Sequence, residues 1–170
     1  WQAAHAELRG PAIFFAQPEY WEAEFARAEG AREWVTAPAP EQLSALDACA
    51  AARRAQGLPF EVLHAGCGTS DLAALILHRF PHAVVTNVDA SSSAIEAARR
   101  RRPSCERCRW AVADALELPA AFGTEPRFDA VVDKGLVDSL LHGGAFVAAA
   151  YVQGAAQLLR LGGAFVSISD

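Results

Sequence analysis

The chain has 170 residues, of which 52% are hydrophobic and 21% charged, and its formal net charge is −5. This length suits one domain, and the apolar fraction excludes an intrinsically disordered chain. No uninterrupted apolar run reaches the roughly 18 residues that a membrane span needs, and the negative charge argues against a general nucleic-acid surface. We therefore expect neither a membrane nor a nucleic acid as partner. The arginine run 99–102 is interpreted as cations at a helix C-terminus.

Residues 1–40 are predicted to form an aromatic lead-in segment in front of the main domain, which spans 41–170. Trp21 and Phe25 lie four residues apart, as on one face of a helix, and Pro38 and Pro40 end that helix. A second helix is predicted over 41–56. The chain lacks an initiator Met and stops directly after a strand pattern, so we interpret it as a piece of a longer protein.

The rest of the chain alternates between strand and helix patterns. The predicted strands are 60–65, 82–88, 109–113, 128–132 and 164–169, and the predicted helices are 70–79, 93–102 and 145–161. A capping box of Ser93 and Glu96 is expected to open the 93–102 helix, and Gly162-Gly163 to close the last one. Such alternation predicts βαβ units and, with right-handed crossovers, an α/β, Rossmann-like doubly wound parallel sheet with helices on both faces.

The residues that follow the predicted strands are the candidates for a ligand site, because ligands bind outside the carboxyl ends of strands in open parallel sheets. A Gly66-x-Gly68 turn follows the first strand, and Asp89, Asp114 and Asp133 follow the next three. Each aspartate alone is as often a turn or cap residue. Three of them at equivalent positions, beside a glycine turn, indicate one ligand that lies across the sheet edge.

The turn and the first aspartate favour an adenosine-type cofactor. Gly66 and Gly68 permit close approach of a ligand to backbone N–H groups. Asp89 lies 23 residues after Gly66, near the spacing of about 20 expected for a carboxylate that accepts from ribose hydroxyls. A dinucleotide fingerprint expects a third glycine where this chain has Asp71, whose charge would repel a pyrophosphate. A cationic nucleoside without phosphate, such as S-adenosylmethionine, is not repelled in this way.

These motifs resemble those of class I (seven-β-strand) S-adenosylmethionine-dependent methyltransferases. Residues 63–70 (LHAGCGTS) are similar to the glycine-rich motif of that superfamily, 88–91 (VDAS) to its acidic motif, and 113–115 (ADA) to the motif that contacts adenine. The resemblance implies a sheet that continues for two more strands, so strands 6 and 7 are expected to be missing from this chain.

Two further segments resemble a particular group within the superfamily. Residues 128–138 (FDAVVDKGLVD) and the aromatic lead-in are similar to the protein lysine methyltransferases that act on elongation factor 1A and on citrate synthase. The chain departs from that group at Leu136, where a small hydroxyl residue is usual, at Phe25, where Tyr is common, and at Val35, where an aromatic residue is common.

The resemblance implies a role for each matching residue. Three aromatic residues would close over the methionine end of the cofactor, two glycines would pass beneath it, Asp89 would hold the ribose, and Lys134 would lie beside the pocket. The complete set expected to bind the cofactor is Trp21, Phe25, Trp34, Gly66, Gly68, Asp89, Ala90, Asp114, Ala115 and Lys134. Lys134 is also the only lysine among the 15 Lys and Arg residues of the chain.

The expected activity is methyl transfer to a lysine side chain of a protein substrate in the cytoplasm or a mitochondrion. A lysine acceptor must first lose its proton, since its free pKa is about 10.4. Asp133 and Asp138 are the candidate carboxylates for this step, with helix capping as the alternative role of Asp138. In-line displacement at a sulfonium requires no metal, and Cys105-x-x-Cys108 has no second pair of metal ligands at suitable spacing.

Other functions remain open at this stage. One is a small-molecule methyltransferase or aminopropyl transferase on the same fold, and another is a non-catalytic, methyltransferase-like binding module. A nicotinamide oxidoreductase comes last. His64 lies within a predicted strand and is interpreted as a packed residue, and Ser91 to Ser93 lack the His and Asp partners of a hydrolase triad. The oligomeric state is not predicted.

Overall fold

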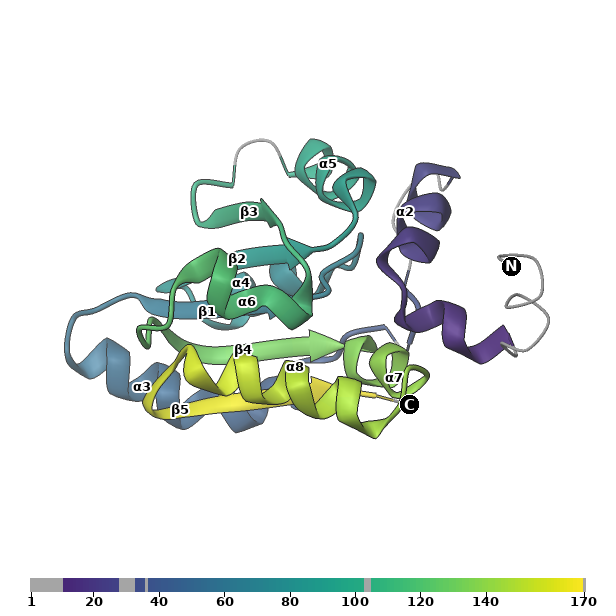
Figure 1. Ribbon diagram of the computed structural model, residues 1–170. Coiled ribbons are helices and arrows are strands. Elements are labelled where there is room, and N and C mark those ends of the chain that lie inside the picture. Colours follow the sequence, from purple (N-terminus) through teal and green to yellow (C-terminus); the bar gives the residue numbers. More distant parts are fainter. Residues whose placement is uncertain (1–10, 28–32, 36, 103–104, 170) are drawn as a thin grey trace.

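The computed structural model describes residues 11–27, 33–35, 37–102 and 105–169 and contains one five-stranded sheet (Figure 1). Its strands are β1 (Phe60–Ala65), β2 (Ala83–Asp89), β3 (Cys108–Val112), β4 (Phe128–Lys134) and β5 (Leu159–Ile168). All neighbouring strands pair in parallel, in the order β3-β2-β1-β4-β5. The order reverses between β1 and β4, which is the point where doubly wound sheets bind ligands. The predicted Rossmann-like α/β fold is confirmed.

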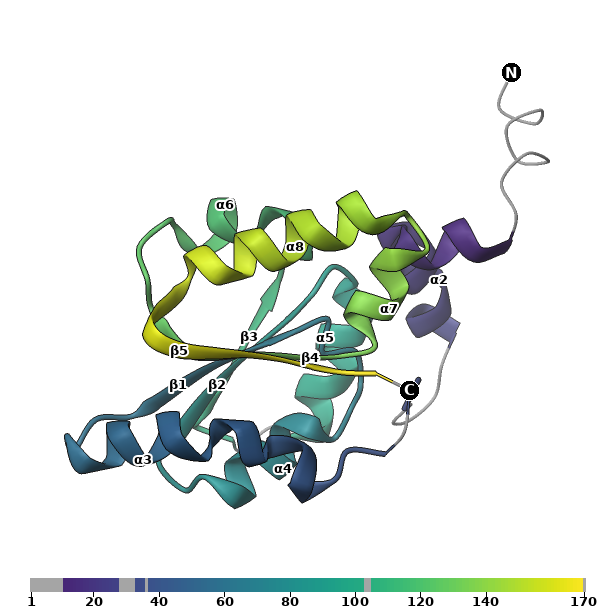
Figure 2. The same ribbon diagram turned by 90° about the horizontal axis from the view of Figure 1, so that it is seen from below.

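Helices cover both faces of this sheet (Figure 2). The segment η2 (Pro40–Leu46), α3 (Asp47–Ala55) and α4 (Leu72–Arg79) cover one face, while α6 (Leu118–Phe122), α7 (Leu136–Leu141) and α8 (Ala145–Gln157) cover the other. Helix α5 (Ser92–Arg101) packs beside β2 and β3. Each face has its own apolar core, centred on Phe60 and Leu72 in the first and on Leu63 and Tyr151 in the second. Strand β4 is buried along all seven of its residues, as expected for a central parallel strand.

The lead-in lies beyond the carboxyl ends of the strands. It comprises η1 (Pro11–Ala16) and α2 (Pro18–Arg27), and Figure 1 shows both at the end of the sheet toward which the β4 arrow points. Helix α2 packs against α5, and η1 packs against α7. The lead-in therefore covers the edge at which the sequence predicts a ligand.

The predicted capping box of the 93–102 helix is wrong. Helix α5 begins at Ser92, and its N-cap is Ser91, whose hydroxyl accepts a hydrogen bond from the Ala94 N–H. The Ser93 hydroxyl donates instead to Glu22 of α2, at 2.6 Å. A tertiary contact therefore uses the serine that local sequence would assign to the cap.

The boundaries around β4 and β5 also differ from the prediction. Helix α8 ends at Gln157, and Gly162 and Gly163 lie inside β5 rather than at the helix end. A register shift between β4 and β5 accommodates them, with Gly162 at φ 80°. Strand β4 continues two residues beyond the predicted end and includes Asp133 and Lys134, and the short helix α7 after it was not predicted.

The described helices are all too short or too polar to cross a lipid bilayer.

Candidate cofactor site

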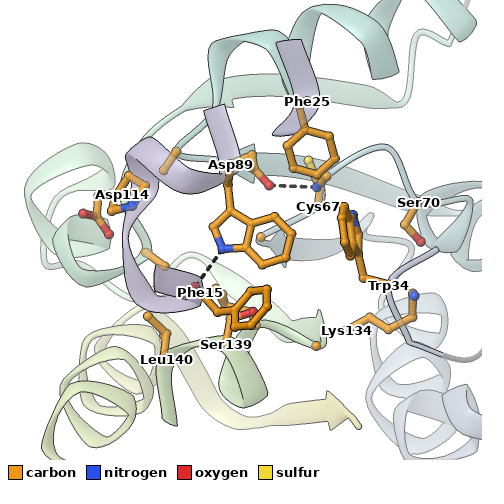
Figure 3. A pocket seen from close by; sticks show the side chains of 18 of the residues that line it. Phe15, Phe25, Trp34, Cys67, Ser70, Asp89, Asp114, Lys134, Ser139 and Leu140 are labelled. Atoms are coloured by element: carbon orange, nitrogen blue, oxygen red, sulfur yellow. Dashed lines mark hydrogen bonds between the residues drawn. The ribbon is translucent and has the colours of Figure 1, made fainter. Parts of the chain in front are cut away.

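A cavity lies at the carboxyl edge of the sheet, under the lead-in (Figure 3). About 830 Å³ of space lies between its lining residues, including the solvent at its open mouth. All ten residues that the sequence assigned to a cofactor line this one cavity: Trp21, Phe25, Trp34, Gly66, Gly68, Asp89, Ala90, Asp114, Ala115 and Lys134. The structure thus brings together side chains that are more than 110 positions apart in the chain.

The glycine turn between β1 and α4 forms part of the cavity wall. Gly66 and Gly68 have φ of 58° and 48°, in the left-handed region that favours glycine. A Cβ at Gly66 would lie 3.0 Å from the Leu136 Cβ, and one at Gly68 would lie 3.0 Å from the Phe25 Cζ. Both glycines are therefore required by backbone conformation and by close approach of a neighbouring side chain.

Asp89 is the last residue of β2, and its carboxylate is held in place by loop backbone. One oxygen accepts a hydrogen bond from the Gly68 N–H at 2.8 Å, and the other accepts from the Ser91 N–H at 2.9 Å. Burial raises the pKa of this carboxyl, while the two N–H bonds counteract the rise. Each oxygen keeps a further lone pair, so the carboxylate can still accept from two hydroxyls of a ligand.

Asp114 follows β3 and marks the far end of the cavity in Figure 3. Its carboxylate caps the short η3 (Ala115–Glu117) by accepting from the Leu116 N–H at 2.9 Å. Ala113 and Ala115 line the wall beside it. Small side chains next to a carboxylate leave room for a flat ring and offer an acceptor to an exocyclic amino group.

Aromatic rings form the roof of the cavity. Trp21 contacts Trp34 edge to face with ring centroids 4.9 Å apart, and Phe25 lies 6.0 Å from Trp21 and 6.3 Å from Trp34. The Trp21 indole N–H donates to the Phe15 carbonyl at 2.7 Å. Phe15 itself lines the cavity, which sequence reasoning missed, although its place among the lead-in aromatics was a usable signal.

Two glutamates fasten the lead-in to the domain. Glu22 accepts from the hydroxyls of Ser91 at 2.7 Å and Ser93 at 2.6 Å, and these bonds lower its pKa. Glu33 accepts from the Asp71 N–H at 2.8 Å and pairs with Lys134 at 2.6 Å. Neither glutamate was predicted as a functional residue.

Two of the four arginines in the run 99–102 contact residues that follow the glycine turn. Arg101 and Arg102, at the end of α5, both pair with the Asp71 carboxylate, and Arg101 also donates to the Thr69 carbonyl. The run was interpreted as a partner of the helix dipole. The structure adds a direct ionic contact between α5 and the first turn of α4.

The two predicted catalytic carboxylates do not line the cavity. Asp133 is fully buried and points to the α8 face of the sheet, where it accepts from the hydroxyls of Tyr151 at 3.2 Å and Ser167 at 2.9 Å. Burial raises its pKa to about 6. Asp138 lies half-buried in the first turn of α7, and its Oδ2 is buried without a hydrogen-bond partner in the described part of the chain.

The wall next to α7 was not predicted. Ala16, Leu136, Ser139 and Leu140 line it together with Phe15. In Figure 3, Phe15, Ser139 and Leu140 lie together on the side away from Phe25. The wall depends on α7, a helix too short to be recognised from hydrophobic periodicity.

The remaining polar candidates are structural. His64 is buried in β1, its Nδ1 lies 3.1 Å from the Asn87 side-chain oxygen, and burial lowers its pKa to about 4. All four cysteines are free thiols. Among the described residues there is no group of three or more His, Cys, Asp or Glu side chains that could hold a metal ion.

The sheet order and the cavity at its switch point define a Rossmann-like domain with a candidate ligand site at the carboxyl edge of the sheet. The model of the methyltransferase domain family matches residues 62–163, more than half of the chain, and the chain belongs to this family. No curated protein matches it.

Several solved structures are similar to this fold. One comes from work on the conversion of a disulfide bond into a thioacetal group during echinomycin biosynthesis; it is 30% identical, with a TM-score of 0.56 over 85% of this chain and 57% of that one. The N-methyltransferase NodS from Bradyrhizobium japonicum WM9, solved with S-adenosylhomocysteine, is 20% identical, with a TM-score of 0.56 over 88% and 71%.

The sugar N-methyltransferase KedS8 from Streptoalloteichus sp. is 19% identical, with a TM-score of 0.53 over 84% and 58%. Sequence identities of 19% and 20% show only that these two proteins share the fold of this chain. The chain spans little more than half the length of the first structure.

Proposed function

We propose that this protein binds S-adenosylmethionine and transfers its methyl group to a second substrate. The observation that carries the proposal is the order of groups along the cavity. Asp114 follows β3, Asp89 ends β2, the glycine turn follows β1 and Lys134 ends β4. This order suits a base, a ribose and an amino-acid end, one after the other across adjacent strands. The 30%-identical structure and the family match support the same assignment.

The charges of the cavity favour a cationic nucleoside over a dinucleotide. Its charged lining residues in the described chain are Asp89, Asp114 and Lys134, and the lysine is already paired with Glu33. Asp71, expected from the sequence to repel a pyrophosphate, is the N-cap residue of α4, and its carboxylate is paired with Arg101 and Arg102. The preference for a ligand with a net positive charge therefore rests on the two aspartates that line the cavity.

When bound, S-adenosylmethionine supplies a methyl group on a sulfonium, which passes to a nucleophile and leaves neutral S-adenosylhomocysteine. The chain contributes mainly by positioning. Asp89 fixes the ribose, the glycine turn lets the ligand approach the backbone, and the aromatic roof of Trp21, Phe25 and Trp34 excludes water. Orientation of two reactants about 3 Å apart supplies much of the acceleration of such a displacement.

For the acceptor, the sequence resemblance supports a lysine side chain of a protein, such as an elongation factor 1A-like or citrate synthase-like substrate in the cytoplasm or a mitochondrion. In this proposal the carboxylate of Asp133 or Asp138 takes the proton that the ammonium must lose. Neither carboxylate lines the cavity, and for Asp138, which lies on α7, this helix would have to turn on substrate binding. Such a turn would allow the buried Oδ2 of Asp138, which has no hydrogen-bond partner among the described residues, to accept a hydrogen bond from the substrate ammonium.

A small, uncharged acceptor is the second candidate. The wall formed by Phe15, Leu136, Ser139 and Leu140 is apolar apart from one hydroxyl, which suits a neutral group better than an ammonium. The 30%-identical structure from echinomycin biosynthesis supports this candidate.

Two measurements test these proposals. Calorimetry with S-adenosylmethionine and S-adenosylhomocysteine tests the cofactor, and absence of binding to the folded chain would reject it. A second experiment tests the acceptor. The protein is incubated with methyl-labelled S-adenosylmethionine and a cell extract, and the mixture is then separated into protein and small-molecule fractions. Methyllysine in the protein fraction supports the first candidate, and label in the small molecules supports the second. Binding without any transfer would leave a non-catalytic module.

A further inference from the structure

Glu33 and Lys134 form an ion pair at one end of the cavity, where Lys134 belongs to the lining and Glu33 lies directly behind it, with its side chain 24% exposed. The Lys134 Nζ lies 2.6 Å from the Glu33 Oε2, and the lysine side chain is only 3% exposed. The other oxygen of Glu33, Oε1, accepts from the Ser70 hydroxyl at 3.1 Å and from the Asp71 N–H at 2.8 Å. Glu33 is thus anchored to the start of α4 through one oxygen, while its second oxygen faces the lysine.

The pair lies at the end of the cavity opposite to Asp114. Figure 3 shows Asp114 on one side, Asp89 between, and Ser70, Trp34 and Lys134 together on the other side. The strand order gives the same sequence, because Asp114 follows the edge strand β3 and Lys134 ends β4, across β1 from β2. A nucleoside with its base at Asp114 and its ribose at Asp89 therefore directs its 5′ substituent toward the ion pair.

We propose that Glu33 and Lys134 together bind the amino-acid end of the cofactor: Glu33 holds its ammonium and Lys134 holds its carboxylate. This inference rests on the proposed function. The pair opens and the zwitterion inserts between Glu33 and Lys134. Glu33 then pairs with the ligand ammonium instead of Lys134, and Lys134 pairs with the ligand carboxylate instead of Glu33. Oε1 of Glu33 remains bonded to Ser70 and Asp71 throughout.

Charge balance favours this exchange. Separating a buried ion pair is strongly unfavourable when one partner is left uncompensated. A zwitterion compensates both partners at once, whereas a simple anion or a simple cation would replace the partner of only one of them. The pair therefore selects a ligand that carries both charges on adjacent groups, and it stays closed when the ligand carries neither.

The experiment compares three adenosyl thioethers by calorimetry on the full chain. S-adenosylhomocysteine carries both charges, its decarboxylated form carries only the ammonium, and 5′-methylthioadenosine carries neither. The variants are Glu33→Gln, Lys134→Met and the double variant. Asp47→Asn and Arg79→Met serve as controls, because these residues form an ion pair of similar length, 2.7 Å, that lies away from the cavity and is more exposed.

We expect Glu33→Gln to weaken S-adenosylhomocysteine and its decarboxylated form by about 10- to 100-fold, the loss of one charge-assisted hydrogen bond. Lys134→Met should weaken S-adenosylhomocysteine by a similar factor but not the decarboxylated form. Affinity for 5′-methylthioadenosine should change by less than about threefold in every variant, which also shows that the variants are folded. The control variants should leave all three affinities unchanged.

Other results overturn the inference. Unchanged or tighter binding of S-adenosylhomocysteine to Glu33→Gln would mean that Glu33 merely competes for the lysine. Equal losses for all three ligands would mean that the pair only stabilises the fold. If Lys134→Met does not fold, Glu33→Gln and the double variant decide. Failure of the unmodified chain to bind any of the three would reject the proposed function itself.

Discussion

Asp89, at the end of β2, and Asp133, near the end of β4, are both buried, yet their carboxylates face different surroundings. Asp89 accepts from the backbone of two loops and lines the cavity. Asp133 accepts from the hydroxyls of Tyr151 and Ser167 and is shut off from it. Burial raises the pKa of both carboxyls. A raised pKa at a strand end therefore does not by itself identify a functional group.

The difference follows from where each strand ends. Asp89 is the last residue of β2, so its carboxylate faces the loops that follow the strands. Asp133 is the penultimate residue of β4, and Lys134 completes the strand. Since successive side chains of a strand point to opposite faces, Lys134 and Asp133 must point apart. The Lys134 side chain lines the cavity, and the Asp133 side chain points to the α8 face of the sheet.

The largest effect that this comparison predicts is loss of cofactor binding in Asp89→Ala. The substitution removes two acceptors for the ribose and also releases the Gly68 and Ser91 N–H groups. Charge-assisted bonds contribute roughly 1.5–3 kcal/mol each, so S-adenosylhomocysteine should bind on the order of 100-fold more weakly or worse. Calorimetry measures this. In Asp133→Asn the same affinity should change by less than about threefold, and equal losses in the two variants would break the comparison.

The next effect concerns pH and belongs to Asp133. Its pKa rises from 3.8 to about 6 on folding, so between these values the folded protein holds a proton that the unfolded chain has lost. The contribution to stability is present below pH 4 and is lost as pH rises through about 6, by about 3 kcal/mol.

Asp133→Asn should remove this contribution. The free energy of unfolding of the unmodified chain, measured with denaturant at pH 4, 5, 6 and 7, should fall relative to that of the variant as pH rises. Parallel curves for the two proteins would show that Asp133 ionises in the fold as readily as in the unfolded chain.

A smaller effect is expected at the glycine turn. Gly68→Ala places a Cβ in a left-handed conformation and 3.0 Å from the Phe25 ring, and we expect a loss of about 2 kcal/mol in unfolding free energy. Gly57 has a similar φ of 68° but nothing within 4 Å, so Gly57→Ala should lose only about 1 kcal/mol. Denaturant unfolding compares the two. Equal losses would show that Phe25 does not press on the turn.

Sequence reasoning located the cavity because its logic depends only on topology. Gly66, Asp89 and Asp114 follow three parallel strands, and parallel strands end at one edge, so their meeting required no detail of packing. The direction of Asp133 did require detail. With β4 ending at Val132, as the sequence suggested, Asp133 would belong to the loop. Because β4 continues through Asp133 and Lys134, the Asp133 side chain points to the face of the sheet away from the cavity.

Contacts that depend on tertiary packing could not be predicted from the sequence. Helix α7 contains only six residues, too few for a periodic pattern, so Ser139 and Leu140 could not be placed. Glu33 was visible only as the neighbour of an aromatic residue. Its pairing with Lys134 spans 101 positions and depends on how the lead-in folds back over the sheet. Local patterns do not encode such a distance.

The smallest predicted effect tests how firmly the lead-in is held. Glu22 fastens α2 to α5 through the hydroxyls of Ser91 and Ser93, and α2 carries Trp21 and Phe25 over the cavity. Glu22→Gln keeps one acceptor and loses the charge, and because the site is close to solvent we expect only a two- to threefold weaker affinity for S-adenosylhomocysteine.

The serine bonds lower the pKa of Glu22, so its contribution is present above the ordinary glutamate range and is lost as pH falls. The affinities of the variant and the unmodified chain for S-adenosylhomocysteine should therefore differ at pH 7, and the difference should shrink as the pH falls below the ordinary glutamate pKa. Glu96→Gln is the control, because Glu96 lies on the same α5 but pairs only with the exposed Arg100. A loss as large as that of Asp89→Ala would mean that closure of the lead-in, rather than the strand ends, dominates cofactor binding.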